Sequence, residues 1–315
     1  MRILIAGGAG FIGSNFVRYL VRYYPQDEII VLDKLTYAGR KENLNEVKDK
    51  IIFIQGDICN DQDITRAGTC DVIFNFAAET HVDRSISDPT TFVNTDVLGT
   101  CTLLNYALKN NISRYIQIST DEVYGSIRQG SSSEDDRLDP SSPYSASKAS
   151  AEHLVMAFYK TYGLPVLITR SSNNYGPYQY PEKLIPVLIL KALSDSPLPI
   201  YGDGLNIRDW LHVEDNCAAI DRVFSKGKAG EIYNIGAGEE KTNLDIAKII
   251  LKKLGKPETM IRHVVDRPGH DFRYSVATEK IRNLGWKPSW LFEDGISSTI
   301  SWYRSNSSWW KPLIR

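Results

Sequence analysis

The sequence predicts an α/β fold: a doubly wound parallel sheet, joined to a smaller, mixed α/β lobe on the C-terminal side. In the first half of the chain, short and almost continuously apolar segments alternate with helical patterns, which is typical of parallel strands buried on both faces. After Arg170, loops rich in Asn, Gly, Pro and Tyr dominate. We therefore expect a first domain over 1–170, with segments near 206–236 returning to it, and a second lobe over 171–315.

The chain opens with the pattern of a strand, a glycine loop and a helix. The apolar run Ile3–Ile5 leads into Gly7, Gly10 and Gly13, and a helical pattern follows over 16–23. Glycines at these positions permit a tight turn and let backbone N–H groups approach a pyrophosphate at the helix N-terminus. A glycine triplet alone is more often an ordinary turn, and the spacing differs by one residue from Gly-x-Gly-x-x-Gly. In this context it predicts a Rossmann-type dinucleotide site.

The second predicted strand, 29–32, ends in Asp33, twenty residues beyond Gly13. A carboxylate at this point accepts hydrogen bonds from a ribose diol and repels a 2′-phosphate, so the sequence predicts NAD rather than NADP. The next strands, 51–54 and 72–76, lead to Asp57 and to Ala77-Ala78. Asp57 either lines an adenine pocket or caps the segment after its strand, with neither favoured, and the two small alanines suit the wall beside a nicotinamide.

A predicted helix over 96–110 and a strand over 115–119 come next, and the strand leads to Asp121 and Glu122. Adjacent side chains leaving a strand point in different directions, so one carboxyl group could serve as acid and the other as base.

Tyr144 and Lys148 are four residues apart in a predicted helix over 143–162, ahead of a strand over 166–169, and therefore share one helix face. A lysine cation beside a phenol is expected to lower the pKa of Tyr144 towards neutrality. A lone Tyr-x-x-x-Lys is usually structural, and an Asp-Glu pair is more often a turn with a helix cap. The dinucleotide site upstream favours the functional interpretation of both.

Five segments together resemble the extended short-chain dehydrogenase/reductase superfamily and, within it, the dTDP-glucose 4,6-dehydratases. They are the glycine loop 7–13, Ala77–Ser85, Thr120-Asp121-Glu122, Tyr144–Lys148 and Arg170–Tyr178. The Thr-Asp-Glu triplet discriminates, because the related epimerases lack this acid pair. The chain departs from the superfamily pattern at Asp96, where Asn is usual and supports the hydrogen-bond network of the active site.

The resemblance implies a dehydration of dTDP-glucose to dTDP-4-keto-6-deoxyglucose. In that reaction Tyr144, assisted by Lys148, takes the O4 proton while C4 is oxidised, and Thr120 holds the hydroxyl group. Glu122 then acts as base at C5 and Asp121 as acid at the C6 hydroxyl, which requires a raised pKa of Asp121. NAD receives the hydride and returns it to C6.

The resemblance also implies the remaining site residues. Residues expected to bind the cofactor, besides Tyr144 and Lys148, are Gly7, Gly10, Phe11, Ile12, Gly13, Asp33, Lys34, Leu35, Thr36, Asp57, Ile58, Ala77, Ala78, Thr95 and Asn174. Residues expected to bind the sugar nucleotide, besides the catalytic triplet, are Thr80, Asn173, Lys183, Leu184, Pro199, Ile200, Tyr201, Arg208, Asn243, Arg267 and His270. Arg208 and Arg267 are expected at the diphosphate, because the planar guanidinium binds phosphate oxygens in bidentate fashion.

Whole-chain properties exclude several other classes. The 315 residues carry 37 basic and 38 acidic side chains, a balance that offers no footprint for nucleic acid. The four cysteines have no metal-like spacing and are expected to stay reduced, and no metal site is expected. No apolar run is long enough to span a membrane, and a strand begins where a signal peptide would lie. These features predict a cytoplasmic protein without a membrane partner, and the resemblance implies a homodimer.

Other functions remain open on the sequence alone. Another NAD-dependent sugar-nucleotide 4,6-dehydratase would use the same residues, whereas a C4 epimerase or decarboxylase on this scaffold would not need both carboxylates. An NAD-sensing regulator would keep the glycine loop and Asp33 but could lose Tyr144 or Lys148, both of which this chain retains. The aromatic tail, Trp302-Tyr303 and Trp309-Trp310, is expected to serve packing rather than chemistry.

Overall fold

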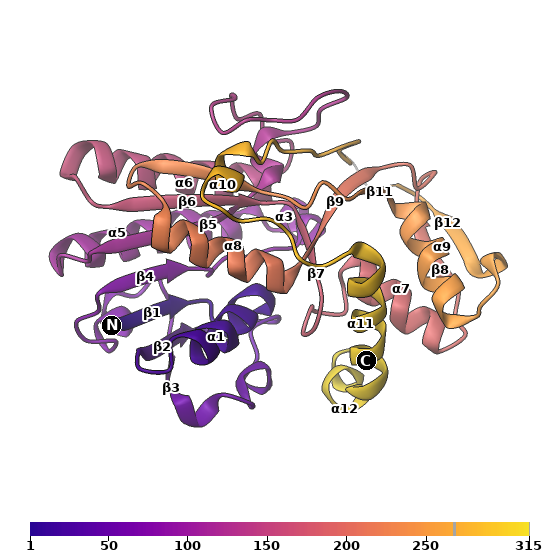
Figure 1. Cartoon of the computed structure of the whole chain (residues 1–315), viewed down its shortest axis with the longest axis horizontal. Coiled ribbons are helices and arrows are strands. Elements are labelled where there is room, and N and C mark those ends of the chain that lie inside the picture. Colours follow the sequence, from indigo (N-terminus) through magenta and orange to yellow (C-terminus); the bar gives the residue numbers. More distant parts are fainter. Residues whose placement is uncertain (267–268, 315) are drawn as a thin grey trace.

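The larger part of the protein is built on a parallel sheet of seven strands in the order β10-β6-β5-β4-β1-β2-β3 (Figure 1). The computed structural model describes residues 1–266 and 269–314. The strands are β1 (Arg2–Ala6), β2 (Glu28–Asp33), β3 (Ile51–Gln55), β4 (Val72–Asn75), β5 (Arg114–Thr120), β6 (Val166–Ser171) and β10 (Glu231–Ile235). Every pairing between them is parallel, so the predicted doubly wound sheet is confirmed. The strand order reverses between β1 and β4, which is where open α/β sheets bind ligands.

Helices cover both faces of this sheet. One core contains side chains of α1 (Phe11–Tyr23) and α8 (Val213–Lys226), and the other contains side chains of α2 (Asp61–Thr65), α5 (Thr100–Lys109) and α6 (Pro143–Tyr162). Strand β1 shows why its sequence is continuously apolar: Ile3 and Ile5 belong to the first core, whereas Leu4 and Ala6 belong to the second. Successive side chains of a strand point to opposite faces, so both sets must be apolar.

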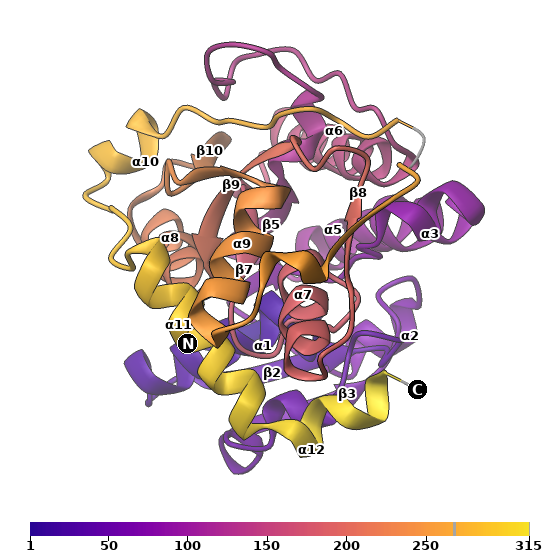
Figure 2. The same cartoon turned by 90° about the vertical axis from the view of Figure 1, so that its right-hand side faces the viewer.

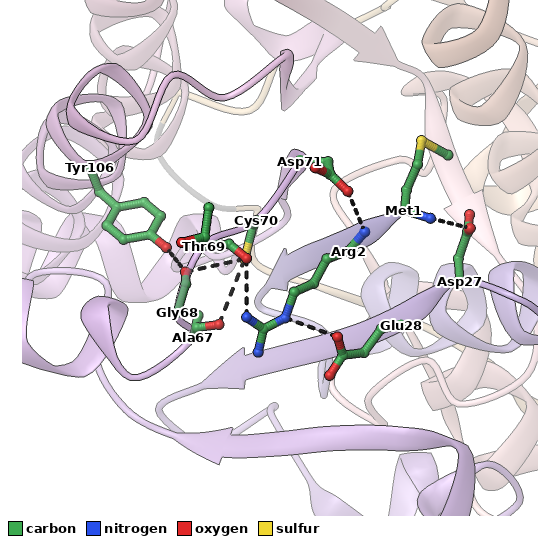
Figure 3. Close-up of polar contacts among 10 residues, drawn as sticks. All are labelled: Met1, Arg2, Asp27, Glu28, Ala67, Gly68, Thr69, Cys70, Asp71 and Tyr106. Atoms are coloured by element: carbon green, nitrogen blue, oxygen red, sulfur yellow. Dashed lines mark hydrogen bonds and ion pairs between the residues drawn. The ribbon is translucent and has the colours of Figure 1, made fainter.

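The amino-terminal edge of the sheet is held by polar contacts (Figure 3). The Met1 ammonium group pairs with Asp27, and the Arg2 guanidinium pairs with Glu28 at 3.0 Å. The main-chain N–H of Arg2 donates to Asp71 Oδ2 at 2.7 Å. These contacts tie β1 to the starts of β2 and β4, at the end of the sheet opposite the glycine loop.

A smaller lobe lies at the carboxyl edge of the sheet, on the right in Figure 1 and facing the viewer in Figure 2. It contains a mixed three-stranded sheet, β11-β9-β7, and a parallel pair, β12-β8. These strands are β7 (Asn173–Tyr175), β8 (Leu198–Tyr201), β9 (Ile207–His212), β11 (Glu240–Thr242) and β12 (Ile261–Val264). Its longer helices are α7 (Leu184–Leu193), α9 (Asn243–Leu254) and α11 (Phe292–Ser305).

The aromatic end of the chain packs into this lobe. Tyr303 and Trp309 are buried in its core, on α11 and on the short helix α12 (Ser307–Trp310). The prediction that the tail serves packing is confirmed.

The chain returns to the large sheet after entering the lobe. β10 pairs with β6 and α8 covers the sheet, whereas β9 belongs to the three-stranded sheet. Helix α10 (Glu279–Asn283) then lies against β10. The domain division at residue 170 stays a prediction.

The helix expected over 96–110 begins earlier than predicted. Short helices α3 (Val82–Ser87) and α4 (Pro89–Phe92) precede it, and π-helical turns over Val93–Gly99 join α4 to α5. Asp88 starts α4, because its side chain accepts a hydrogen bond from the N–H of Thr91 at 3.3 Å and proline follows it. Within the described residues, no helix combines the length and the apolar character needed to cross a membrane.

Candidate active site

A cleft of about 1590 Å³, including space open to solvent, follows the carboxyl edge of the sheet beside the glycine loop. Backbone atoms lie so close to two residues of the glycine loop that only glycine fits there. Gly7 has φ +74°, and a Cβ on it would lie 2.4 Å from Ala77 N. A Cβ on Gly13 would lie 2.3 Å from the carbonyl oxygen of Gly7. The first turn of α1 therefore packs directly on the loop, as a pyrophosphate cradle requires.

Asp33 lies at the end of β2, lines the cleft and is 8% exposed. Its Oδ2 accepts a hydrogen bond from Ala9 N and its Oδ1 one from Leu35 N, both at 2.8 Å. Burial raises the pKa of Asp33, and these two hydrogen bonds oppose that effect. Each carboxylate oxygen has a second lone pair, so the group can still accept hydroxyl hydrogen bonds from a ribose.

Asp57 forms an ion pair with Lys34 at 2.7 Å between Oδ2 and Nζ, and both residues line the cleft. Asp57 Oδ1 also accepts a hydrogen bond from Cys59 N at 2.9 Å. Asp57 thus both faces the cleft and holds the turn after β3, so the two alternatives for this residue are not exclusive.

Tyr144 and Lys148 lie one turn apart near the start of α6, and both side chains line the cleft. The helix begins with a capping box of Ser142 and Ser145 and with Pro143 at its first position, features that favour a helix start here. Lys148 Nζ donates a hydrogen bond to the carbonyl oxygen of Ile118 on β5 at 2.7 Å. The lysine head group is therefore fixed against the strand that carries the acid pair.

The expectation of a lowered pKa for Tyr144 is wrong. The pKa of Tyr144 is raised well above its ordinary value, first by burial and then by the nearby Glu122, Asp96 and Asp121 carboxyl groups. Helical spacing predicted the lysine as a neighbour, but three carboxyl groups from other elements are also close enough to act on the phenol.

Asp121 and Glu122 follow β5 in a 3₁₀ turn, Asp121–Tyr124, that is capped by Thr120. Asp121 is 3% exposed, and its Oδ1 accepts a hydrogen bond from Thr120 Oγ1 at 3.2 Å. Burial and, after it, the charge of Glu122 raise the pKa of Asp121 well above the ordinary carboxyl value. The predicted direction of this shift is confirmed, and a raised pKa favours the protonated form that a general acid requires.

Buried polar oxygens along the cleft fit a polar ligand. In the described part of the chain, buried side-chain oxygens without a hydrogen-bond partner line the cleft, among them those of Ser119, Asp121, Asn173, Asn174 and Gln179. Buried polar groups are ordinarily paired. With the glycine cradle at one end and Asp33 beside it, the residues present fit a dinucleotide together with a hydroxyl-rich second ligand.

Most of the expected site residues line this single cleft. All expected catalytic residues do so, as do all expected cofactor-binding residues except Leu35. Leu35 instead packs on the sheet core and offers its N–H to Asp33. Of the residues expected to bind the sugar nucleotide, Thr80, Asn173 and Lys183 also line the cleft, and Lys183 Nζ donates to the carbonyl oxygen of Thr80 at 2.6 Å.

The other residues expected to bind the sugar nucleotide do not line the cleft. These are Leu184, Pro199, Ile200, Tyr201, Arg208, Asn243 and His270, all in the smaller lobe. Ile200 is buried in the core of that lobe, so its side chain cannot also face a ligand. Arg267 lies outside the described residues.

Arg208 is buried on β9, with its guanidinium bonded to main-chain carbonyl oxygens. Nη1 donates to Ile207 O at 2.7 Å, and Nη2 donates to Asp271 O at 2.9 Å. Its charge still acts on Asp121, whose pKa it lowers against the larger effect of burial. His270 Nδ1 lies 2.7 Å from Asp266 Oδ1.

Several lining residues were not expected from the sequence. The main ones are Tyr37, Glu79, Ser119, Ser172, Gln179, Tyr180 and Glu182. Glu79 could have been predicted as a lining residue, because it lies between two residues that the sequence already placed at the site. Tyr37 and Tyr180 come from distant loops that meet edge-on, with ring centroids 5.4 Å apart, a contact that only the folded chain brings about.

Similar proteins agree with this site. The family model described as GDP-mannose 4,6 dehydratase matches residues 4–299. The chain is 51% identical to a dTDP-glucose 4,6-dehydratase of Streptomyces niveus, covering 99% of this chain and 96% of that protein. It is also 51% identical to the low-salt glycan biosynthesis protein Agl12 of Haloferax volcanii, covering 96% and 98%.

Among solved structures, the chain is similar to DesIV, a dTDP-glucose 4,6-dehydratase from Streptomyces venezuelae with NAD and TYD bound. The TM-score is 0.97 at 50% identity, covering 99% of this chain and 100% of that one. The resemblance in sequence, the shared fold and the match over nearly the whole length lead to one conclusion: the chain belongs to the dTDP-glucose 4,6-dehydratase family of the extended short-chain dehydrogenase/reductases.

Proposed function

We propose that the protein catalyses the NAD-dependent dehydration of dTDP-glucose to dTDP-4-keto-6-deoxyglucose, a precursor of deoxysugars. The observation that carries the proposal is a buried Asp121 with a raised pKa, next to Glu122 and in the same cleft as Tyr144 and Lys148. Two separate sets of proton-transfer groups thus face one ligand space. An oxidation needs one set and a water elimination needs the other.

In the proposed reaction Tyr144 takes the proton from O4 of the glucose ring, and Lys148 supports the phenolate. Thr120 holds the O4 hydroxyl group. Bound NAD⁺ would accept the hydride from C4, and the NADH so formed would return it to C6; the positive nicotinamide ring would also favour the phenolate. The ketone at C4 acidifies the C5 hydrogen, so Glu122 removes that proton while Asp121 protonates the departing C6 hydroxyl.

The cofactor binds along the glycine loop and Asp33. We place the pyrophosphate over Gly7, Gly10 and Gly13 and the adenosine ribose at Asp33. Ala77 and Ala78 form the wall beside the nicotinamide.

The sugar nucleotide extends from the acid pair towards the smaller lobe. Thr80, Asn173 and Lys183 are proposed to contact it from the cleft. The lobe residues outside the cleft, Arg208 above all, are proposed to reach the diphosphate only after a local rearrangement, because the guanidinium is bonded to carbonyl oxygens.

A labelled substrate tests this function. dTDP-glucose carrying deuterium at C4 is incubated with the protein and NAD, and the product is examined for absorbance in alkali and for the position of the label. We expect a 4-keto product with the label at C6 and almost no exchange between labelled and unlabelled molecules. A product epimerised at C4 would identify a C4 epimerase, and label lost to water would contradict the closed transfer.

We further infer a homodimer that pairs through helices on one face of the sheet. Ile86, Val93 and Leu98 are 45%, 53% and 52% exposed and lie on α3 and on the π-helical turns, beside α6. Val93 and Leu98 are five residues apart, one π-helical turn, and therefore lie on the same side. We expect light scattering to report a dimer for the wild type and a monomer for Leu98→Glu. A dimer in both cases would show that the interface does not include Leu98.

A cytoplasmic location is also proposed. All four cysteines are free thiols, as is usual in a reducing compartment. Fractionation of the source cells tests it, and recovery from an extracytoplasmic fraction would contradict it.

A further inference from the structure

Asp96 is a buried carboxyl group next to the active site that the proposed reaction does not use. It lies in the π-helical turns Val93–Gly99 and is 1% exposed. Its neighbour Thr95 lines the cleft, whereas Asp96 is buried and does not line it. π-Helical turns inside an α-helix often mark functional sites.

Two hydrogen bonds connect Asp96 to the walls of the active site. Its Oδ1 accepts a hydrogen bond from Glu79 N at 2.9 Å, and Glu79 lines the cleft. Its Oδ2 lies 2.6 Å from Ser147 Oγ, and Ser147 directly precedes Lys148 in α6. Asp96 therefore joins the segment after β4 to the helix turn that carries Tyr144 and Lys148.

The hydrogen bonds around Asp96 can be satisfied both when its carboxyl group is ionised and when it is protonated. Ser147 Oγ also lies 2.8 Å from the carbonyl oxygen of Tyr144, and a hydroxyl group has only one proton to donate. When Asp96 is ionised, that proton must go to the carboxylate. When Asp96 is protonated, the acid can donate to Ser147, and the hydroxyl proton turns to the Tyr144 carbonyl.

The charge of Asp96 acts on both members of the catalytic pair. Burial lowers the pKa of Lys148, and the charges of Asp96 and Glu152 raise it. The charge of Asp96 also adds to the raised pKa of Tyr144. The pKa of Asp96 itself is about 6, raised by burial against the opposing effect of Lys148.

The ionisable groups around this cluster come from several elements. Cys59 and Glu79 lie in the loops after β3 and β4. Burial raises the pKa of each, and the charge of Asp96 adds to that effect. Glu152 faces Lys148 from the next turn of α6, and Asp121 and Glu122 face Tyr144 from the end of β5. Asp96 is the one group among these whose charge acts on both Tyr144 and Lys148. The other groups therefore cannot substitute for its charge.

We propose that Asp96 is a positioning residue that sets the pH range in which Tyr144 and Lys148 work, through the negative charge that it places beside them. A negative charge makes it harder to remove a proton from either neighbour. The phenol then needs a higher pH to become a base, and the ammonium group persists to a higher pH. The pH range in which the enzyme is active therefore moves to higher pH. This inference rests on the proposed function.

The variant Asp96→Asn tests the charge alone. Asn keeps the size, accepts from Glu79 N through its oxygen and donates to Ser147 Oγ through its amide. With the holoenzyme and dTDP-glucose, the rate at which bound NADH appears is measured against pH. We expect both limbs of the profile to move to lower pH in the variant, by on the order of one pH unit each. Limbs that coincide with those of the wild type would overturn the proposal.

Asp221→Asn serves as the matched control. Asp221 accepts hydrogen bonds from the Tyr19 and Tyr24 hydroxyl groups at 3.0 and 2.6 Å, on the α1 and α8 face of the sheet. We expect this variant to leave both limbs in place. An equal shift in Asp221→Asn would show that the effect is not specific to Asp96, and it would overturn the proposal.

A second variant keeps the test decisive if Asp96→Asn folds poorly. Ser147→Ala removes a donor from the ionised Asp96, so the carboxyl group should stay protonated to higher pH and the profile should move in the same direction. If the pH profile of Ser147→Ala coincided with that of the wild type, the proposal would be contradicted. It would also be contradicted if Ser147→Ala shifted the profile by the same amount in an Asp96→Asn background as in the wild type.

An infrared difference spectrum gives a readout that does not depend on turnover. Between pH values below and above about 6, the wild type should lose a protonated carboxyl band that Asp96→Asn lacks. A wild type that forms no bound NADH with dTDP-glucose would contradict the proposed function instead, while the infrared result would still decide whether Asp96 titrates.

Discussion

Lys148 Nζ donates a hydrogen bond to the carbonyl oxygen of Ile118 at 2.7 Å. This contact joins α6 to β5 three residues before Asp121, so the lysine proposed to support oxidation lies against the strand that leads to the acid proposed to support elimination. The oxidation and elimination groups therefore keep a fixed spacing, and one sugar ring can meet both without leaving the cleft.

Variants of the two sets should therefore separate the two halves of the reaction. Asp121→Asn and Glu122→Gln are expected to form bound NADH with dTDP-glucose and yet to lose product by about 10²–10⁴-fold, the usual effect of a missing general acid or base. Tyr144→Phe is expected to form neither. Rapid-mixing absorbance and product analysis measure the two quantities. The assignment fails if Tyr144→Phe accumulates bound NADH as readily as Glu122→Gln.

Asp33 should make the protein select NAD over NADP, because the 2′-phosphate would face a buried carboxylate. Titration of cofactor-free protein with each dinucleotide measures the ratio of dissociation constants. Asp33→Asn is expected to bring the two dissociation constants closer together. Asp61 is an exposed carboxylate in the first turn of α2, and Asp61→Asn should leave the ratio unchanged. Equal affinities of the wild type for both cofactors would refute the role of Asp33.

The ion pair between Glu152 and Arg170 should contribute strongly to stability. The side chains are 2% and 3% exposed, with Oε2 and Nη2 2.6 Å apart. Removing one partner leaves a buried charge unpaired, so Glu152→Gln is expected to lower the free energy of unfolding by about 3–5 kcal/mol.

Glu293→Gln is the control for this loss. It breaks the pair of Lys253 with a carboxylate that is 63% exposed and should cost about 1 kcal/mol or less. Urea denaturation compares the two, and equal losses would mean that burial does not decide the energy of these pairs.

Much of the fold and of the cofactor end of the cleft could be predicted from the sequence, because local patterns determine them. The Gly7–Gly13 loop and Asp33 each follow an apolar strand, and carboxyl ends of parallel strands meet at one edge. Tyr144 and Lys148 are neighbours by helical spacing alone.

Other parts of the site depend on tertiary packing. The direction of the Tyr144 pKa shift follows from burial and from three carboxyl groups that two other elements bring close to the phenol. The position of Arg208 depends on how the 271–274 segment lies over β9, and Tyr37 meets Tyr180 only because two loops far apart in sequence converge. No local pattern encodes such contacts.

Asp96 should make the stability of the protein depend on pH in a predictable direction. Its folded-state pKa of about 6 lies above the ordinary value of 3.8, so the folded state holds the proton more tightly than the unfolded state does. Its contribution is most favourable below pH 3.8 and is lost as the pH rises through about 6. Asp96→Asn avoids this loss.

The variant should therefore gain stability relative to the wild type as the pH rises through this interval, by about 3 kcal/mol at most. Urea denaturation at a series of pH values measures the difference. A difference that stays constant from acidic to neutral pH would show that Asp96 does not titrate with a raised pKa. The Ser147 hydroxyl would then have to donate to an ionised Asp96 throughout, and the charge beside Lys148 would be permanent.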